Sequence, residues 1–139
     1  SHVTIQGLTF THTPNTYMRS YAVPSGGDVS IHKGGAIFAQ GTEFLNIANN
    51  NFTYIAGNSI FPSQYNLNAT IVENEFVWLG DNAIVLIGVT DGIDGISNRN
   101  QPTYSNIVSN LIHETGAYVE QSSPVMISVC RATQVIGNA

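Results

Sequence analysis

Four acidic residues are candidates for catalysis: Asp81, Asp91, Asp94 and Glu120. Two such carboxyl groups could serve as general acid and general base at a glycosidic bond if they lie about 5–9.5 Å apart. Asp81 belongs to the segment Gly80-Asp81-Asn82-Ala83-Ile84. An aspartate beside a glycine also caps its own bend, so this segment predicts either glycoside chemistry or a structural turn.

The segment 90–95 reads Thr-Asp-Gly-Ile-Asp-Gly, and two acids on a glycine-containing loop could bind Ca²⁺. The spacing of Asp91 and Asp94 does not match an EF-hand loop or the nonapeptide calcium repeat. The four histidines are scattered, and no His-Glu-x-x-His pattern for zinc occurs. We therefore expect no cofactor, with Ca²⁺ as the weaker alternative.

Four ring-bearing side chains are candidates for glycan binding: Tyr17, Tyr21, Tyr104 and His113. Aromatic rings offer apolar faces on which sugar rings can stack. His113 directly follows the apolar Ile112, so strand alternation points its imidazole outward, where it could also exchange protons with an acid. The same residues could instead cover loop bases or form a solvated edge, and these alternatives stay open.

Composition excludes some classes of function. Only 9% of the 139 residues are charged, lysine and arginine together total 4, and the formal net charge is -5. So few cations cannot neutralise nucleic-acid phosphates or bind an anionic membrane surface. No apolar run approaches the roughly 18 residues that a membrane span needs. We therefore expect no nucleic acid partner and no membrane insertion.

Three residues bear on redox state and modification. Cys130 is the single cysteine, which excludes an internal disulfide, and its apolar neighbours favour a small buried side chain over a reactive thiol. Asn51 and Asn68 begin the N-glycosylation sequons Asn-Phe-Thr and Asn-Ala-Thr. Both are expected to carry glycans if the source is eukaryotic and the protein is secreted.

A six-residue phrase, Ile-x-x-Asn-x followed by a large apolar residue, recurs at 47–52, 71–76 and 107–112. A truncated copy occupies 135–139, and a copy at 5–10 has Leu in place of Asn. Strands this short bury their apolar face only if each pass of the chain stacks about 4.8 Å above the last. The asparagines would then form a hydrogen-bonded ladder at a bend where each can adopt the left-handed conformation. The ladder consists of Asn50, Asn74, Asn110 and Asn138.

A second phrase, Gly followed by a polar residue and an apolar one, occurs at 57–60 and 80–84, with looser copies at 35–37 and 116–119. The two phrases therefore predict that each unit consists of a strand, an asparagine bend, a second strand, a glycine bend, a third strand and a loop. We expect a single domain over residues 1–139: a single-stranded parallel β-helix of about four to five coils. Loop insertions near 11–33 and 89–103 break the period. Neither end carries a polar cap, so the helix is expected to continue in a longer protein.

These phrases resemble the pectate-lyase-like right-handed parallel β-helix superfamily, and the runs 76–84 and 110–116 resemble its secreted, uncharacterised repeat proteins. The resemblance implies a right-handed helix, an extracellular or cell-surface location, and a polysaccharide or glycan partner. Gly80-Asp81-Asn82 is similar to the Gly-Asp-Asp motif of β-helix polygalacturonases, but Asn82 replaces the second acid. The Asn-Thr-Asp and Gly-His-Gly motifs of those enzymes are absent.

Two functions follow as hypotheses. The first is an extracellular carbohydrate-directed module, which could belong to a glycoside hydrolase or a polysaccharide lyase. The second is a non-catalytic structural, adhesive or fibre-forming module, whose open terminal coils could associate end to end or with flanking domains. The position of Asp81 discriminates between them, because catalysis needs a second outward carboxylate beside it in a groove.

Overall fold

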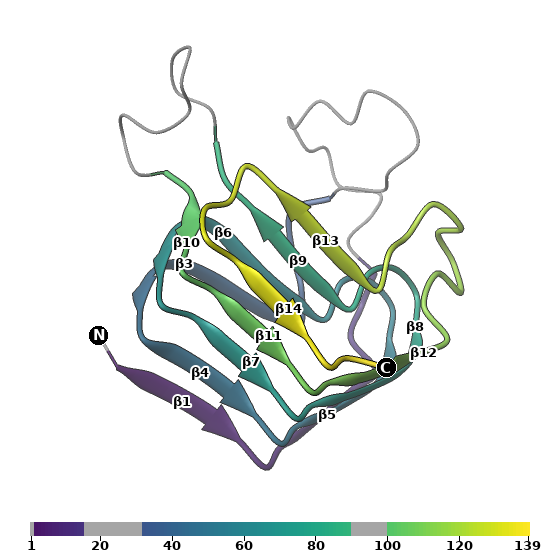
Figure 1. Cartoon of the computed structure of the whole chain (residues 1–139). Coiled ribbons are helices and arrows are strands. Elements are labelled where there is room, and N and C mark those ends of the chain that lie inside the picture. The colour runs from purple at the N-terminus through teal and green to yellow at the C-terminus, as the bar shows by residue number, and fades with distance from the viewer. Residues whose placement is uncertain (1, 16–31, 90–99) are drawn as a thin grey trace.

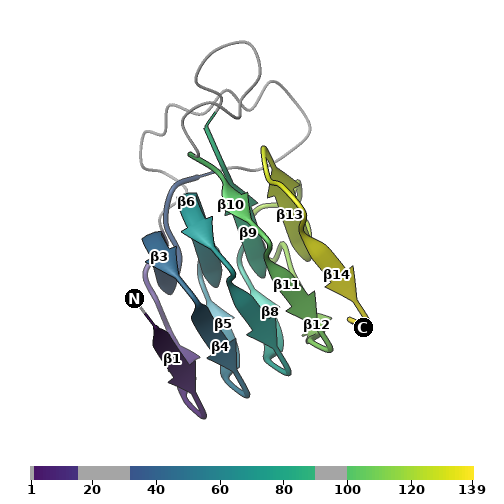
Figure 2. The ribbon, with the colours of Figure 1, turned by 60° about the vertical axis from the view of Figure 1, so that its left-hand side comes forward.

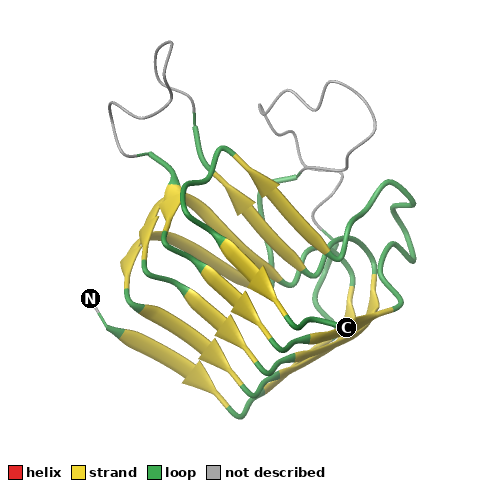
Figure 3. Ribbon diagram, viewed as in Figure 1, coloured by secondary structure: helices red, strands yellow, loops and turns green. Residues whose placement is uncertain are grey.

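The computed structural model describes residues 2–15, 32–89 and 100–139, and within these ranges the chain is all-β (Figure 3). Every strand pairing between the described residues is parallel. The described residues contain no helix of the length and apolarity that a membrane span requires. The expectation of an all-β chain with parallel sheets is confirmed.

The strands form three sheets. The first sheet has the order β1 (Val3–Gln6), β4 (Leu45–Ala48), β7 (Thr70–Val72), β11 (Asn106–Val108) and β14 (Gln134–Ile136). The second has the order β12 (Leu111–His113), β8 (Glu75–Leu79), β5 (Asn51–Ile55) and β2 (Thr9–Thr11). The third has the order β10 (Pro102–Thr103), β6 (Ile60–Leu67), β9 (Ile84–Ile87) and β13 (Val125–Ser128), and β3 (Ile37–Glu43) also pairs with β6.

Successive passes of the chain add successive parallel strands to the three sheets (Figures 1 and 2), and the third sheet also contains the short β10 beside β6. Strands β4, β5 and β6 form one pass through the three sheets, and β7, β8 and β9 form the next. The first residues of the sequence phrase are aligned across the first sheet: Ile5, Ile47, Ile71, Ile107 and Val135. The unequal spacing of the phrase along the sequence therefore reflects loops of unequal length between strands that stack in register.

The core lies between the sheets and consists of side chains that repeat from pass to pass. Phe52 stacks between Phe10 and Phe76, with ring centroids 4.8 and 4.9 Å apart. Ile47 and Ile71 from the first sheet, like Phe52, are buried from solvent. Burying a side chain of this size contributes about 1.5–3 kcal/mol. The repeated apolar positions thus supply a continuous core along the stack.

The phrase asparagines form a column of hydrogen bonds at the corner between the first and second sheets. The Oδ1 atom of Asn74 accepts bonds from the backbone N and from Nδ2 of Asn50, both 3.0 Å long. Nδ2 of Asn74 donates to the carbonyl of Ile47 at 2.9 Å and to Oδ1 of Asn110 at 3.0 Å. Asn110 bonds to Asn138 in the same way at 2.8–2.9 Å. These bonds pair buried amide groups that would otherwise be unsatisfied.

The backbone of this corner differs from the expectation in one respect. The left-handed conformation belongs to the residue before each asparagine, and not to the asparagine itself. The positive-φ residues of the corner are Gly7, Asn49, Glu73, Ser109 and Gly137. The turn is made one residue early, because each ladder asparagine needs its backbone N directed along the stack toward the next Oδ1.

A second difference concerns residues 116–119. They are not a copy of the glycine phrase, because Val125 pairs with Ile84 and β13 begins there. Residues 114–124 instead form a loop between β12 and β13, the yellow-green loop at the right of Figure 1. This loop is a third interruption of the period, beside the two insertions near 11–33 and 89–103.

Candidate functional site

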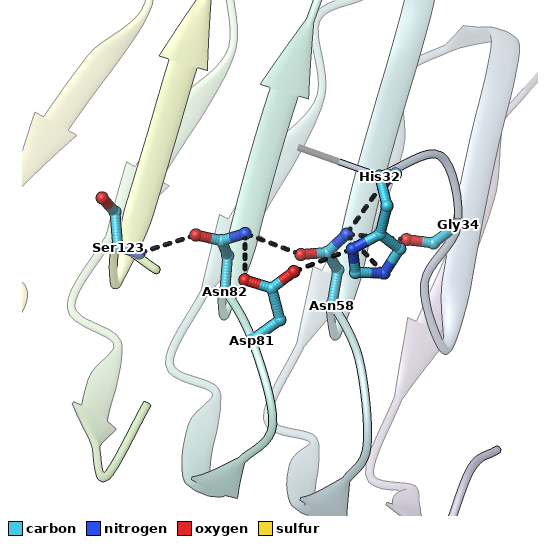
Figure 4. Close-up of polar contacts among 6 residues, drawn as sticks. All are labelled: His32, Gly34, Asn58, Asp81, Asn82 and Ser123. Carbon is cyan, nitrogen blue, oxygen red and sulfur yellow. Dashed lines mark hydrogen bonds and ion pairs between the residues drawn. The ribbon is translucent and has the colours of Figure 1, made fainter. Parts of the chain in front are cut away.

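A second column of amides runs through the corner between the second and third sheets (Figure 4). Nδ2 of Asn82 donates to Oδ1 of Asn58 and to Oδ1 of Asp81, each at 2.8 Å. Nδ2 of Asn58 donates to the carbonyls of His32 at 3.1 Å and Gly34 at 3.0 Å. The column therefore joins the bends of successive passes to the segment that leads into β3.

Asp81, the foremost catalytic candidate, lies inside this column. Its side chain is fully buried, and its Oδ2 lies 2.8 Å from Nδ1 of His32, which is also buried. Its backbone carbonyl accepts a bond from Gly116 at 3.3 Å. A buried carboxylate enclosed by an imidazole and an amide holds three segments of chain together, and it does not face solvent where a polymer could reach it.

The remaining sequence candidates are dispersed. Glu120 is exposed in the loop 114–124, and His113 is exposed at the end of β12 in the second sheet, pointing outward as alternation predicts. Tyr104 is half-exposed at the corner before β11 of the first sheet. Four further candidates lie outside the described residues: Tyr17, Tyr21, Asp91 and Asp94.

The two sequon asparagines lie in different environments. Asn51 begins β5 and is partly buried, whereas Asn68 lies at the corner before β7 with a φ of 54°. Within the described part of the chain, no three His, Cys, Asp or Glu side chains come together as a metal-binding group. The segment 90–95, on which the Ca²⁺ alternative rests, lies outside those residues.

A groove of about 460 Å³ crosses the outer side of the corner between the second and third sheets. Ring-bearing side chains from four successive passes line it: His12, Tyr54, Trp78 and Tyr118. Small residues lie between them: Thr13, Ala56, Gly80 and Ala117. We call this feature the aromatic groove. Its volume lies in the range of sites that bind small molecules, and its mostly apolar wall suits a ligand with apolar faces.

Backbone conformation turns the first three rings outward. Tyr54 and Trp78 have φ values of 52° and 57° and are 56% and 50% exposed. His12 has a φ of 55°, and its ring stacks on Tyr54 with centroids 5.5 Å apart. A left-handed residue inside a strand interrupts the inward–outward alternation. The chain therefore presents a ring to solvent immediately before it buries Ile55 in the core.

Tyr118 reaches the groove through the loop 114–124, which is fixed at several points. Its backbone N donates to the carbonyl of Gly80 at 3.1 Å, and the N of Ala117 donates to the carbonyl of Leu79 at 2.9 Å. The N of Ser123 donates to Oδ1 of Asn82 at 2.6 Å. The loop is thereby attached to the 79–82 bend on both sides of Tyr118, whose ring is 67% exposed.

Gly80 is required for this arrangement. A Cβ atom at this position would overlap the carbonyl of Ala56 and would lie 2.7 Å from Cδ2 of Tyr118. The Gly-Asp-Asn segment that suggests catalysis therefore has another use. Gly80 leaves room for the Tyr118 ring, while Asp81 and Asn82 attach the loop that carries it.

The groove carries little charge. No Asp, Glu, Lys or Arg belongs to its described lining. Glu114 occupies the place in the fourth pass that Trp78 occupies in the third, but its side chain is exposed and does not line the groove. The described lining suits contact with the faces of uncharged rings, and it contains no pair of carboxylates for bond cleavage.

The thiol of Cys130 has a displaced pKa. Burial raises the pKa of its thiol to about 12, although hydrogen bonds to the backbone of Ser128 and Gly88 lower it in part. Its Sγ lies 3.4 Å from the carbonyl oxygens of Leu86 and Ser128. The thiol is therefore protonated at neutral pH, as a small apolar side chain would require.

Sequence reasoning missed the groove, although the repeat contains a signal for it. Three of the ring-bearing residues occur two positions after the large apolar residue of the phrase: His12, Tyr54 and Trp78. Strict alternation assigns that position to the core, and only the left-handed backbone turns it outward. Tyr118 belongs to no copy of the phrase and carries no such signal.

Comparisons of the chain with protein-family models, with curated protein sequences and with solved structures find no match.

Proposed function

We propose that this chain is a carbohydrate-binding module that binds sugar rings in the aromatic groove without cleaving them. The observation that carries the proposal is the groove itself. Tyr54, Trp78 and Tyr118 are each at least half-exposed on one continuous wall, in positions fixed by the fold. Rings that are held in place bind flat apolar faces with little loss of conformational entropy.

We further propose that the fold is a right-handed, single-stranded parallel β-helix, built over residues 1–139 as one domain. The support is the order of the strands. Successive passes add parallel strands to the same three sheets in turn, and the first-sheet residues stay in register from Ile5 to Val135. Parallel strands joined through crossovers are right-handed in almost all proteins.

Binding is favoured over hydrolysis or elimination because of where the acids lie. Glycoside hydrolysis needs two carboxyl groups about 5–9.5 Å apart on either side of the bond. Asp81 is buried against His32, and Glu120 lies on the exposed loop and does not line the groove. A non-catalytic role agrees with this separation.

The proposed partner is a glycan or polysaccharide, and the proposed location is the cell surface or the extracellular space, where such polymers are found. This part of the proposal depends on the resemblance to secreted β-helix proteins and on the chemistry of the groove. Non-catalytic adhesion to a glycan-bearing surface is the form of the structural alternative that the same groove supports.

The test is affinity electrophoresis of the full chain in gels that contain plant, algal or microbial polysaccharides. Trp78→Ala is expected to weaken retardation about tenfold, because the loss of one stacking ring is worth up to roughly 1.5 kcal/mol. Tyr104→Ala is the matched control. Tyr104 is 51% exposed and has a φ of 55°, close to the 50% and 57° of Trp78, but it lies at another corner.

Three outcomes would contradict the proposal. The first is a wild-type chain that runs unretarded in every gel, and the second is a loss of affinity in Tyr104→Ala as large as that in Trp78→Ala. New reducing ends in the polysaccharide, released by the wild type and not by Asp81→Asn, would instead make the protein a hydrolase. Folding of each variant is checked by its melting temperature.

A further inference from the structure

We infer that the ligand of the aromatic groove is an internal stretch of a linear, uncharged polysaccharide that lies along the stacking direction of the passes. This inference rests on the proposed function and makes it specific. It assigns the class of polymer, its direction across the protein and the number of sugar units in contact. Each of these follows from a different property of the groove.

The direction follows from the residues that form the wall. His12, Tyr54, Trp78 and Tyr118 come from four consecutive passes, and the first three occupy equivalent positions at the same corner. Neighbouring parallel strands lie about 4.8 Å apart, so three intervals give a groove roughly 14 Å long. A single sugar ring covers only one or two of these passes. A chain that follows the stack contacts all four.

The extended form of the ligand follows from the interval between rings. The centroids of His12 and Tyr54 are 5.5 Å apart. An extended β-1,4-linked polymer repeats its sugar units at close to the same interval, so successive units can meet successive passes in register. A strongly coiled polymer does not keep this register over four passes.

The ring faces that are free to contact sugar can be inferred from which rings already stack on one another. His12 and Tyr54 stack on one another, which occupies one face of each ring. Trp78 and Tyr118 have no stacked ring partner among the described residues. The third and fourth passes are therefore expected to supply the strongest contacts, and the first two passes supply the ring edges and hydrogen-bonding groups that extend the site.

The absence of charge on the polymer follows from the described lining. It contains no Lys or Arg that could neutralise a uronate, and the formal net charge of the chain is -5. Glu114 is exposed in the pass that follows Trp78, where it would repel an anionic ligand. An acidic polymer would lose hydration of its carboxylates without gaining a cationic partner.

The closing experiment is isothermal titration calorimetry of the full chain with defined oligosaccharides. The probes are neutral β-1,4-linked oligomers of glucose, mannose and xylose, from two to six units long, and galacturonate oligomers of the same lengths. For at least one neutral series, affinity is expected to rise with each unit up to about four and then to level off. Galacturonate oligomers of equal length are expected to bind at least about tenfold more weakly.

Two variants locate the polymer. His12→Ala removes the ring of the first pass, and Tyr118→Ala removes the ring of the fourth. Both are expected to weaken binding of a six-unit oligomer by about fivefold or more, because that oligomer reaches both ends. For a two-unit oligomer, Tyr118→Ala is expected to have a large effect and His12→Ala little. Tyr104→Ala again serves as the control, because it removes an exposed ring at another corner.

The outcomes separate this inference from the proposed function. If affinity depends on Trp78 but not on oligomer length, the groove binds sugar and the inferred direction is wrong. If galacturonate oligomers bind best and their binding depends on Trp78, the inference that the ligand is uncharged is wrong. If no oligosaccharide or polysaccharide binds in a way that depends on Trp78, the carbohydrate function itself fails.

Discussion

Two columns of buried amides run through this molecule, and they differ in regularity. The first column is Asn50, Asn74, Asn110 and Asn138, in which each member bonds to the next in the same way. Among the described residues, the second column contains two asparagines, Asn58 and Asn82. It ends at His32 and Gly34 on one side and at the backbone of Ser123 on the other.

The difference shows where the fold is free to vary. The regular column joins one tight corner to an identical corner in the next pass, so it serves only the scaffold. The irregular column joins the passes to segments that follow no repeat, including the loop that carries Tyr118. Loops of this kind on a rigid framework are where binding residues usually lie. The aromatic groove accordingly lies at the corner with the irregular column.

The largest effect is expected from Asn74→Ala in the regular column. The substitution removes four hydrogen bonds and leaves the backbone N of Asn50 and the carbonyl of Ile47 without this partner inside the protein. Each unsatisfied buried group costs about 1–3 kcal/mol, so the free energy of unfolding should fall by about 3 kcal/mol. Urea denaturation, followed by circular dichroism, measures this change.

The matched control for Asn74→Ala is Asn46→Ala. Asn46 lies in β4 of the first sheet, and its side chain makes no hydrogen bond with another described residue. Its replacement should change the free energy of unfolding by no more than about 0.5 kcal/mol. Equal destabilisation by the two substitutions would mean that the hydrogen bonds of the regular column add nothing to the free energy of unfolding.

A smaller loss of stability, with a loss of binding, is expected from Asn82→Ala in the irregular column. Nδ2 of Asn82 donates to Asp81 and Asn58, and its Oδ1 accepts from Ser123, which is only partly buried. Water can replace part of this set, so the free energy of unfolding should fall by about 2 kcal/mol. Release of Ser123 loosens the loop of Tyr118, and polysaccharide affinity measured by electrophoresis should fall several-fold.

Asn58→Ala separates the two effects of Asn82→Ala. Asn58 belongs to the same column, so its replacement should lower the free energy of unfolding by a similar amount. Its side chain makes no hydrogen bond to the loop 114–124. The affinity of this variant for the polysaccharide should remain close to that of the wild type. If both variants lose affinity equally, the column acts on the groove through general stability, and the positioning role of Asn82 is wrong.

Much of the framework can be predicted from the sequence, because it repeats. The register of the first sheet and the position of the regular column both follow from aligning Ile47, Ile71 and Ile107 with their asparagines. Each pass presents the same physical problem, burial of one apolar face and pairing of one set of bend amides, and so each pass repeats the same solution. Periodicity of this kind predicts parallel stacking from sequence.

The groove could not be predicted in the same way, for two reasons. Tyr54 and Trp78 occupy positions that alternation assigns to the core, and a single left-handed backbone angle at each residue reverses that direction. Tyr118 is positioned by bonds to a bend 38 residues earlier in the chain, at Gly80. The local sequence does not fix the environment of Asp81 either, since a carboxylate in a glycine bend has the same neighbours in sequence whether it faces a groove or a buried histidine.

The smallest effect is expected at the third corner, which follows the third sheet and contains Cys130 where the other corners contain amide columns. Burial raises the pKa of its thiol from 9.0 to about 12. Well below pH 9 the thiol is protonated in both the folded and the unfolded chain, so stability does not change with its ionisation. Between pH 9 and 12 the unfolded chain loses this proton first, and stability falls as pH rises. At pH 10 the loss of free energy of unfolding should be about 1 kcal/mol.

Urea denaturation of the wild type and of Cys130→Ala at pH 7, 8, 9 and 10 measures this loss, because the variant lacks the thiol while retaining every other titrating group. A difference between the two proteins that stays constant across this series would show that the thiol at the third corner is as accessible to solvent as a free cysteine.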